Sequence, residues 1–178
     1  MGIEVPNTRG SRVTGYIQRY FGKKVYFKDI MRVSKIYFSD DELKCKCGCN
    51  GLRLNYIFDS ELMELRKAMN EPMFVNSCCR CKAHNIAVGG NARSLHVYDK
   101  PAHPSNGTCA IDIMRKNKSY DLKLLLEAWD AGWSVGVTPT FFHLDTRTDV
   151  LKMPQVMFAY AGKTDMKELE RFKKLVGA

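Results

Sequence analysis

The chain of 178 residues is long enough for one domain with a sizeable core, and its 45% hydrophobic content excludes a disordered protein. No apolar run approaches the roughly 18 residues of a membrane span, and the amino-terminal MGIEVPNTRGSR lacks the apolar segment of a secretory signal. The net charge of +9 favours association with anions such as nucleic acid, anionic lipid or cell-wall polymer.

Much of this charge lies in residues 1–37, where eight Lys and Arg residues face only Glu4 and Asp29. Aromatic residues are interleaved with them, a pattern that nucleic-acid-binding proteins also show. No recognised nucleic-acid motif accompanies the charge, so no specific nucleic-acid partner is expected. We interpret residues 1–37 as a basic N-terminal extension and residues 38–178 as a single globular domain.

The chain order of the predicted elements indicates an α+β fold. Short strands are expected at 24–30 and 32–38. Residues 39–42 form a helix-start or turn cluster, in which Ser39 and Glu42 have the spacing of a capping box. Hydrophobic periodicity and turn residues then predict helices at 59–70, 121–132 and about 165–176, and strands at 73–77, 109–114, 133–137, 141–146 and 155–160. Helices and strands are segregated rather than alternating, so a small antiparallel sheet with flanking helices is expected.

Six of the seven cysteines lie in two short motifs, CKCGC at 45–49 and CCRC at 78–81. An odd number of cysteines without a secretory signal favours a reducing compartment. These six cysteines could form a structural metal site in addition to any catalytic one, form a disulfide pair, or remain reduced thiols. The C-x-C spacing does not decide among these three possibilities, which concern Cys45, Cys47, Cys49, Cys78, Cys79 and Cys81.

Residues 76–112 concentrate possible metal ligands, with four cysteines and three of the four histidines of the chain. His96, Asp112 and the later His143 supply two nitrogens and one oxygen, the kind of set that a catalytic zinc ion uses. Asp112 lies between Ile111 and Ile113 in a predicted strand, where an unpaired carboxylate would be costly. A carboxylate bonded to backbone amides and histidines satisfied within the core are the alternative interpretation.

The ordered motifs from Phe38 to Arg147 resemble the zinc peptidase family of D-Ala-D-Ala carboxypeptidases, vancomycin-resistance dipeptidases and phage endolysins. This family shares its fold with the hedgehog signalling domain. The motifs that carry the resemblance are Ser94-Leu95-His96, Ala110-Ile111-Asp112 and His143-Leu144-Asp145. The run NSCCRC at 76–81, His84-Asn85, Val88-Gly89-Gly90, FSDDEL and GWSVGV are similar to the phage-type branch.

The resemblance implies one catalytic Zn²⁺ held by His96, Asp112 and His143. It also implies that Arg80 binds substrate or steadies the developing oxyanion and that Ser94 contacts substrate. Related enzymes often place the catalytic base three positions before the last histidine, where this chain has Thr140. Asp145 is the candidate base instead, because strand alternation puts residues 143 and 145 on one face. Orientation of a ligand histidine is its alternative role.

The chain departs from the family between His96 and Asp112, where 15 residues form a longer connection than usual. This connection includes YDKPAHPSN and adds His103. Either the extra residues form a loop at the rim of the site, or His103 replaces His96 as the ligand. We favour His96, because Ser94 precedes it at the family spacing and GGNARSLH aligns without a gap.

The resemblance implies a monomeric zinc peptidase that acts on peptidoglycan stem peptides. The bond would be D-Ala-D-Ala, L-Ala-D-Glu or a cross-link, and its identity cannot be read from the sequence. We expect a phage lysis enzyme or virion component that is made in the host cytoplasm and acts in the periplasm or cell wall after holin-type release. Its basic N-terminal region would approach the anionic envelope. The alternative is a cell-wall-binding or phage structural module that keeps the fold without catalysis.

Overall fold

A computed structural model of the chain describes residues 32–99, 106–160 and 165–178. Most of the predicted basic extension 1–37 lies outside the described residues, as does His103. The described residues thus comprise most of the predicted globular domain and the six residues that precede it.

The centre of this domain is a five-stranded mixed sheet with the order β1-β2-β4-β3-β5. Its strands are β1 (Val75–Ser77), β2 (Ala110–Met114), β3 (Ser134–Val137), β4 (Phe141–Asp145) and β5 (Met157–Ala159). The pairs β1–β2, β2–β4 and β3–β4 are antiparallel, whereas β5 runs parallel to β3. The predicted α+β class is confirmed. The one parallel pair involves the edge strand β5, which follows α5 (Arg147–Leu151) in the chain.

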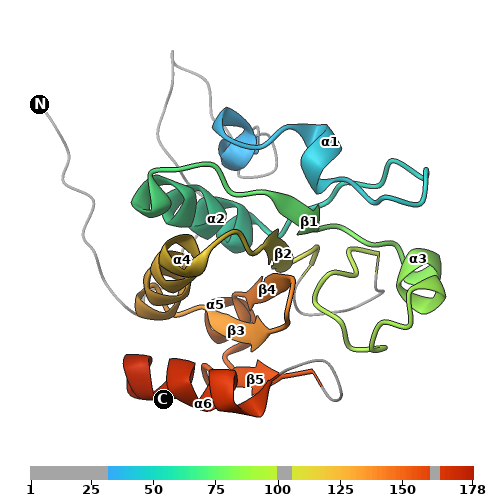
Figure 1. The fold of residues 1–178 in the computed structure, drawn as a ribbon. Helices are drawn as coiled ribbons and strands as arrows, with labels where there is room; N and C mark the ends of the chain where they lie inside the picture. Colours follow the sequence, from blue (N-terminus) through green and yellow to red (C-terminus); the bar gives the residue numbers. More distant parts are fainter. Residues whose placement is uncertain (1–31, 100–105, 161–164) are drawn as a thin grey trace, which may run out of the picture. The chain divides into compact units, whose positions relative to one another are not determined.

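Two long helices supply one side of the core. In Figure 1 these two helices lie on one side of the strands and α3 (Lys82–Ala87) lies on the other. These helices are α2 (Tyr56–Met69) and α4 (Lys118–Asp130), which pack on each other, while α6 (Met166–Val176) packs beside β5. Phe58 of α2 meets Trp133 with their ring centroids 5.7 Å apart. Burial of such large apolar side chains is the main favourable term in folding.

Helix starts follow local capping chemistry. The predicted capping box of Ser39 and Glu42 is present at α1 (Asp40–Leu43). The two long helices begin three residues before the predicted starts, because Asn55 and Asn117 accept hydrogen bonds from the first free backbone N–H groups. An asparagine cap followed by a few residues without clear periodicity gives little signal in the sequence.

The strand predicted at 32–38 is wrong. Residues Val33–Ile36 form a short 3-10 helix, η2, that packs on α2. The buried carboxylate of Asp59 accepts hydrogen bonds from the backbone N–H of Val33, at 2.7 Å, and from the hydroxyl of Ser34. These bonds to a side chain of α2 take the place of the backbone ladder that a strand would need. The short helices α3 and α5 were also not predicted, since neither is long enough to show a period.

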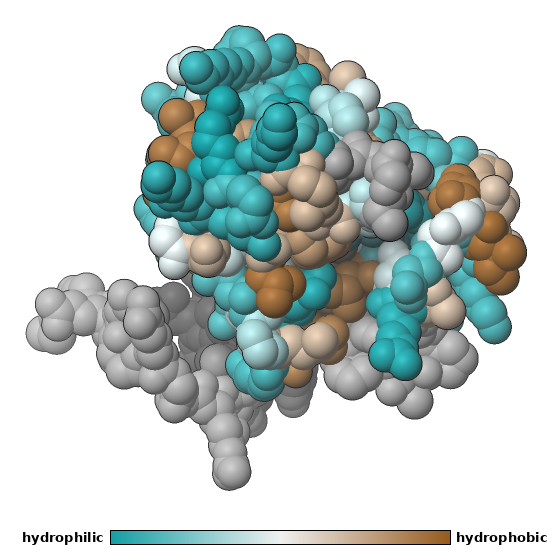
Figure 2. All heavy atoms as spheres, turned by 60° about the horizontal axis from the view of Figure 1, so that its bottom comes forward, coloured by the Kyte–Doolittle hydropathy of each residue, from teal (hydrophilic) through white to brown (hydrophobic). Residues whose placement is uncertain are grey.

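Figure 2 shows one face of the molecule, where hydrophobic side chains form small separate patches among hydrophilic ones. Exposed large hydrophobic residues of the described chain include Ile86, Val88, Met153 and Leu175. Single exposed residues of this kind are normal for folded proteins. In the described ranges, no helix is long and apolar enough to cross a membrane.

Candidate metal centre and active site

Asp112 and His143 face one another across the antiparallel pair of β2 and β4. In β2 the flanking Ile111 and Ile113 are completely buried in the hydrophobic core, so strand alternation directs Asp112 to the opposite face of the sheet. Phe142 and Leu144 do the same for His143 in β4. The alternating pattern of the two strands therefore places one carboxylate and one imidazole side by side.

His96 completes the group from the segment that follows α3, where Arg80 and Val97 form a parallel bridge. Its Nε2 lies 3.1 Å from Asp112 Oδ1 and 3.1 Å from His143 Nδ1. The third side of this triangle, from His143 Nδ1 to Asp112 Oδ1, measures 3.0 Å. All three residues are nearly completely buried. The structure thus brings together the three residues for which the sequence predicted a shared metal ion.

In His96 and His143, the imidazole nitrogen that points away from the triangle has its own hydrogen-bond partner. His96 Nδ1 lies 2.7 Å from the carbonyl oxygen of Cys78, and His143 Nε2 lies 3.1 Å from Asp145 Oδ2. A proton on each of these nitrogens donates to its partner and leaves the inward nitrogen as a lone pair. Partners of this kind orient histidine ligands in metal sites.

The donor set fits a metal ion. Zinc bonds of about 2.0–2.1 Å in tetrahedral geometry place ligand atoms roughly 3.3 Å apart, close to the 3.0–3.1 Å edges of this triangle. Three lone pairs that converge at such distances repel each other unless a proton or a cation lies between them. The residues present therefore suit one Zn²⁺ with an open coordination position.

The charges of the site are interdependent. Burial by itself raises the pKa of Asp112, but the charge of His96 and hydrogen bonds from both histidines hold this pKa well below its usual range. Burial lowers the pKa of His96. It also opposes the charge on His143, yet hydrogen bonds with Asp112 and Asp145 raise the pKa of His143 to about 9. A metal ion bound by the same three residues would compete with protonation of His143.

Arg80 lies beside the triangle, as expected for a residue of the site. Its Nη2 donates to Asp112 Oδ2 at 2.7 Å, and its Nε donates to Ser77 Oγ at 2.9 Å. Arg80 therefore orients the carboxylate through the oxygen that does not face the histidines. Ser77 belongs to the NSCCRC run, but no role of its own was predicted for it from the sequence.

Asp145 is completely buried behind His143. Its Oδ2 lies between His143 Nε2 and Arg147 Nη2, at 3.1 and 2.6 Å, and its Oδ1 accepts the backbone N–H and Nε of Arg147. Both oxygens are thus engaged away from the open side of the site. Of the two roles left open by the sequence, this geometry favours orientation of His143 over proton transfer.

A cavity opens over the ligand triangle. Its wall includes the predicted substrate residues Arg80 and Ser94, together with Lys46, Asn76, His84, Arg93, Thr138, Thr140, Phe141, Arg147, Phe158 and Tyr160. Asp112 is the single acidic residue among the described residues of this wall, which also carries four Lys or Arg side chains. The cavity therefore favours an anionic ligand.

Two aromatic residues of the cavity were not predicted as site residues. The rings of Phe158 and Tyr160 lie 5.9 and 6.2 Å from the imidazole of His143. Burial raises the pKa of Tyr160 above its usual range, so its phenol stays protonated at neutral pH. Phe158 lies in β5 and Tyr160 directly follows this strand, and only the tertiary fold shows that β5 lies beside the site.

The cysteines divide into two groups. Cys45, Cys47, Cys49 and Cys81 lie together, and their sulfur atoms are all within 4.8 Å of one another. Cys78 and Cys79, which the sequence placed in the same group, are instead buried in the hydrophobic core with Cys109. Arg80, which forms the bridge with Val97, stands between Cys79 in the core and Cys81 at the start of α3.

The family described as Peptidase M15 matches residues 36–145. This range is more than half of the chain and contains His96, Asp112 and His143 as well as Arg80, Ser94 and the cysteine motifs. No curated protein matches the chain.

Proposed function

The chain belongs to the peptidase M15 family of zinc-dependent metallopeptidases, and from this premise we propose that it hydrolyses peptidoglycan next to a D-amino acid. The observation that carries this proposal is the triangle of His96, Asp112 and His143, with each imidazole held by a partner on its outer nitrogen. Such a triangle lies at the floor of an open cavity, where a peptide can reach it.

When bound by these three residues, zinc supplies an acidified water molecule and polarises the scissile carbonyl. The residues around it have distinct tasks. Arg80 fixes Asp112, the carbonyl of Cys78 fixes His96, and the Asp145–Arg147 pair fixes His143. Ligands held in this way keep their lone pairs directed at one point and lose little freedom on binding.

Substrate charge is the second basis of the proposal. Stem peptides of peptidoglycan carry free carboxylates, and the cavity wall presents Lys46, Arg80, Arg93 and Arg147. The hydroxyls of Ser94 and Thr140 and the phenol of Tyr160 add polar groups to the same wall. Tyr160 stays protonated beside His143 and is suited to donate to an oxygen on which negative charge develops.

The biological role that we propose is lysis or penetration of a bacterial envelope by a phage, through cleavage of a D-Ala-D-Ala, L-Ala-D-Glu or cross-link amide. The enzyme would be made in the host cytoplasm and would act in the periplasm or cell wall as a monomer. The net charge of +9 supports approach to an anionic envelope.

A second candidate is a binding module that keeps the metal centre and has lost catalysis. The observation in its favour is that, within the described ranges, no carboxylate other than that of Asp112 lines the cavity. Peptidases of this kind need a group that accepts the proton of the water and returns it to the leaving amine. Bound peptidoglycan without any cleavage would identify such a module.

The experiment is digestion of purified peptidoglycan sacculi, followed by mass spectrometry of the released muropeptides. We expect new products whose masses report one class of amide bond, absent from a parallel digest with His143→Ala. Retention of sacculi without new products would support the binding module, and unchanged products with His143→Ala would contradict the assignment of the site.

A further inference from the structure

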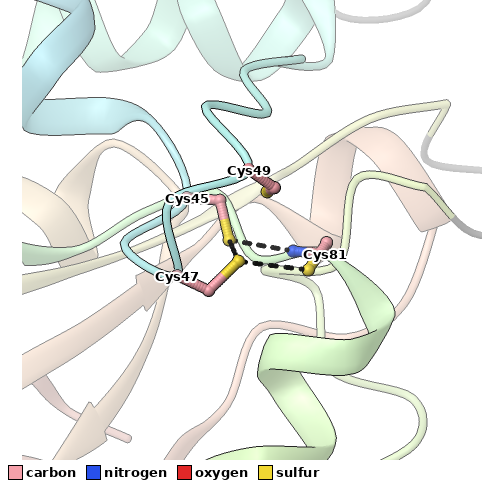
Figure 3. A group of neighbouring side chains, drawn as sticks. All are labelled: Cys45, Cys47, Cys49 and Cys81. Atoms are coloured by element: carbon pink, nitrogen blue, oxygen red, sulfur yellow. Dashed lines mark hydrogen bonds between the residues drawn. The ribbon is translucent and has the colours of Figure 1, made fainter.

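A second cluster of metal-binding side chains lies outside the ligand triangle and shares no residue with it. Cys45, Cys47 and Cys49 come from the loop between α1 and α2, and Cys81 precedes α3, as Figure 3 shows. The Sγ atoms of Cys45 and Cys47 are 3.5 Å apart, and those of Cys47 and Cys81 are 3.6 Å apart. All four sulfur atoms lie within 4.8 Å of one another.

These separations match a tetrahedral thiolate site. Zinc–sulfur bonds of about 2.3 Å place the four sulfur atoms of such a site roughly 3.8 Å apart. From this geometry we propose that Cys45, Cys47, Cys49 and Cys81 bind one structural zinc ion, separate from the catalytic ion. The motif C-x-C-x-C supplies three ligands from one tight loop, and the residue before α3 supplies the fourth.

The surrounding backbone is arranged to stabilise thiolates. The N–H of Cys81 donates to Cys45 Sγ at 3.3 Å, and the N–H of His84 donates to Cys81 Sγ at 3.3 Å at the start of α3. Such donors favour the charged form of the sulfur, which is the form that binds metals.

Side chains enclose the cluster on two further sides. His84 Nδ1 lies 3.2 Å from Cys45 Sγ, and the hydroxyl of Tyr98 lies 3.7 Å from Cys49 Sγ. Tyr98 reaches this position because residue 51 is glycine, since a Cβ there would stand 1.8 Å from the tyrosine oxygen. We assign His84 and Tyr98 as donors to the thiolates, and the four cysteines as the ligands.

The competing arrangement is a disulfide between Cys47 and Cys81, whose sulfur atoms are already close. A disulfide would engage two of the four sulfur atoms and would need an oxidant. It would leave Cys45 and Cys49 with their donors but without a shared partner. One zinc ion accounts for the gathering of all four thiols.

The proposed ion would also hold part of the cavity wall. Lys46 lies between two ligands, and Arg80 directly precedes the ligand Cys81. Both residues line the cavity, and Arg80 contacts Asp112. A metal at the cysteine cluster would therefore fix the backbone at Lys46 and Arg80, two cationic residues beside the active site. A helix as short as α3 stabilises the adjoining backbone only weakly by itself.

Cobalt can distinguish the two sites, because thiolate ligands give charge-transfer absorption and a site of two histidines and a carboxylate does not. The full-length protein is stripped of metal under reducing conditions and titrated with Co²⁺. We expect thiolate-to-cobalt absorption that saturates at one equivalent and persists in His143→Ala. It should disappear in Cys47→Ser and Cys49→Ser, which are placed at the two exposed ligands so that folding is retained. Cys109→Ala, at a buried cysteine outside the cluster, is the matched control and should keep the absorption.

The number of reactive thiols distinguishes the zinc site from the disulfide. In denaturant with a chelator and without reductant, a zinc site leaves all seven cysteines of the chain reactive, whereas one disulfide leaves five. Absence of the thiolate absorption, or five reactive thiols in protein purified without reductant, would overturn the proposal. These measurements report metal–thiolate binding and not hydrolysis, so they succeed or fail independently of the proposed peptidase function.

Discussion

The carboxylate of Asp145 lies 3.1 Å from Nε2 of His143, on the side of the ring away from Asp112. Arg147 holds the same carboxylate at 2.6 and 2.8 Å. Burial opposes the charge on Asp145, but these hydrogen bonds hold the pKa of Asp145 at about 2. Asp145 thus remains an anion at neutral pH and can orient the imidazole that it contacts.

The first prediction concerns this orientation. Asp145→Asn should weaken zinc binding by about 10–100-fold, because the amide fixes the imidazole less firmly than the carboxylate does. Competition with a chromophoric chelator measures the affinity, and Asp149→Asn on α5 is the matched control at a partly exposed carboxylate. If Asp145 were the general base, its replacement would abolish hydrolysis while leaving zinc affinity unchanged.

Arg80 provides the second prediction. Arg80→Lys keeps the charge, but one ammonium group cannot reproduce the fork that contacts both Ser77 and Asp112. We expect a loss in kcat/KM of about 10–100-fold, of the size found when a partner of a metal ligand is removed. Steady-state hydrolysis of a defined muropeptide measures the loss. Arg93→Lys, at an exposed arginine of the same cavity, should change this rate much less.

The third prediction concerns pH and stability. Burial, followed by repulsion from Asp149, raises the pKa of Glu61 in α2 to about 8. Between the ordinary glutamate value and pH 8 the folded state therefore binds more protons than the unfolded state, so stability decreases as pH rises through this window. Urea unfolding of Glu61→Gln between pH 5 and 8 should show a flatter dependence than the wild type.

Glu64→Gln is the control for this measurement, because Glu64 lies on the same helix at the surface and pairs with Lys67. It should keep the wild-type dependence on pH. An unchanged slope in Glu61→Gln would show that this carboxyl group does not carry the effect.

The fourth prediction tests which face of β2 carries the site. Ile113→Ala should lower the free energy of unfolding by about 2–5 kcal/mol, because Ile113 is completely buried in the core. Met114→Ala, at the exposed neighbouring position, should change the stability by roughly 0.5 kcal/mol or less. Comparable losses from both variants would contradict the alternation that directs Asp112 into the cavity.

The ligand triangle could be predicted from the sequence because its motifs are ordered and its strands alternate. Asp112 stands between two isoleucines and His143 between Phe142 and Leu144, so strand periodicity alone places both polar side chains on the face opposite the core. The arrangement of the two strands as direct neighbours follows from the fold, and the register puts the two residues opposite each other.

Other parts of the site could not be predicted, for identifiable reasons. The hydroxyl of Ser77 and the carbonyl of Cys78 lie at the end of β1, and their contacts with Arg80 and His96 depend on the tertiary fold. Phe158 and Tyr160 reach His143 because β5 pairs with β3 in parallel, a long-range pairing invisible in local patterns. The cysteine cluster was predicted too broadly, since sequence proximity does not show that Cys81 joins the cluster while Cys78 and Cys79 lie in the core.

The central claim is that zinc held by His96, Asp112 and His143 makes this chain a peptidoglycan hydrolase. Its most direct test is the rate of hydrolysis of a defined muropeptide by metal-stripped protein before and after addition of zinc. We predict no hydrolysis by the stripped protein, recovery when zinc is added, and no recovery in His143→Ala. Hydrolysis that survives removal of the metal, or that zinc restores equally in His143→Ala, would contradict the claim.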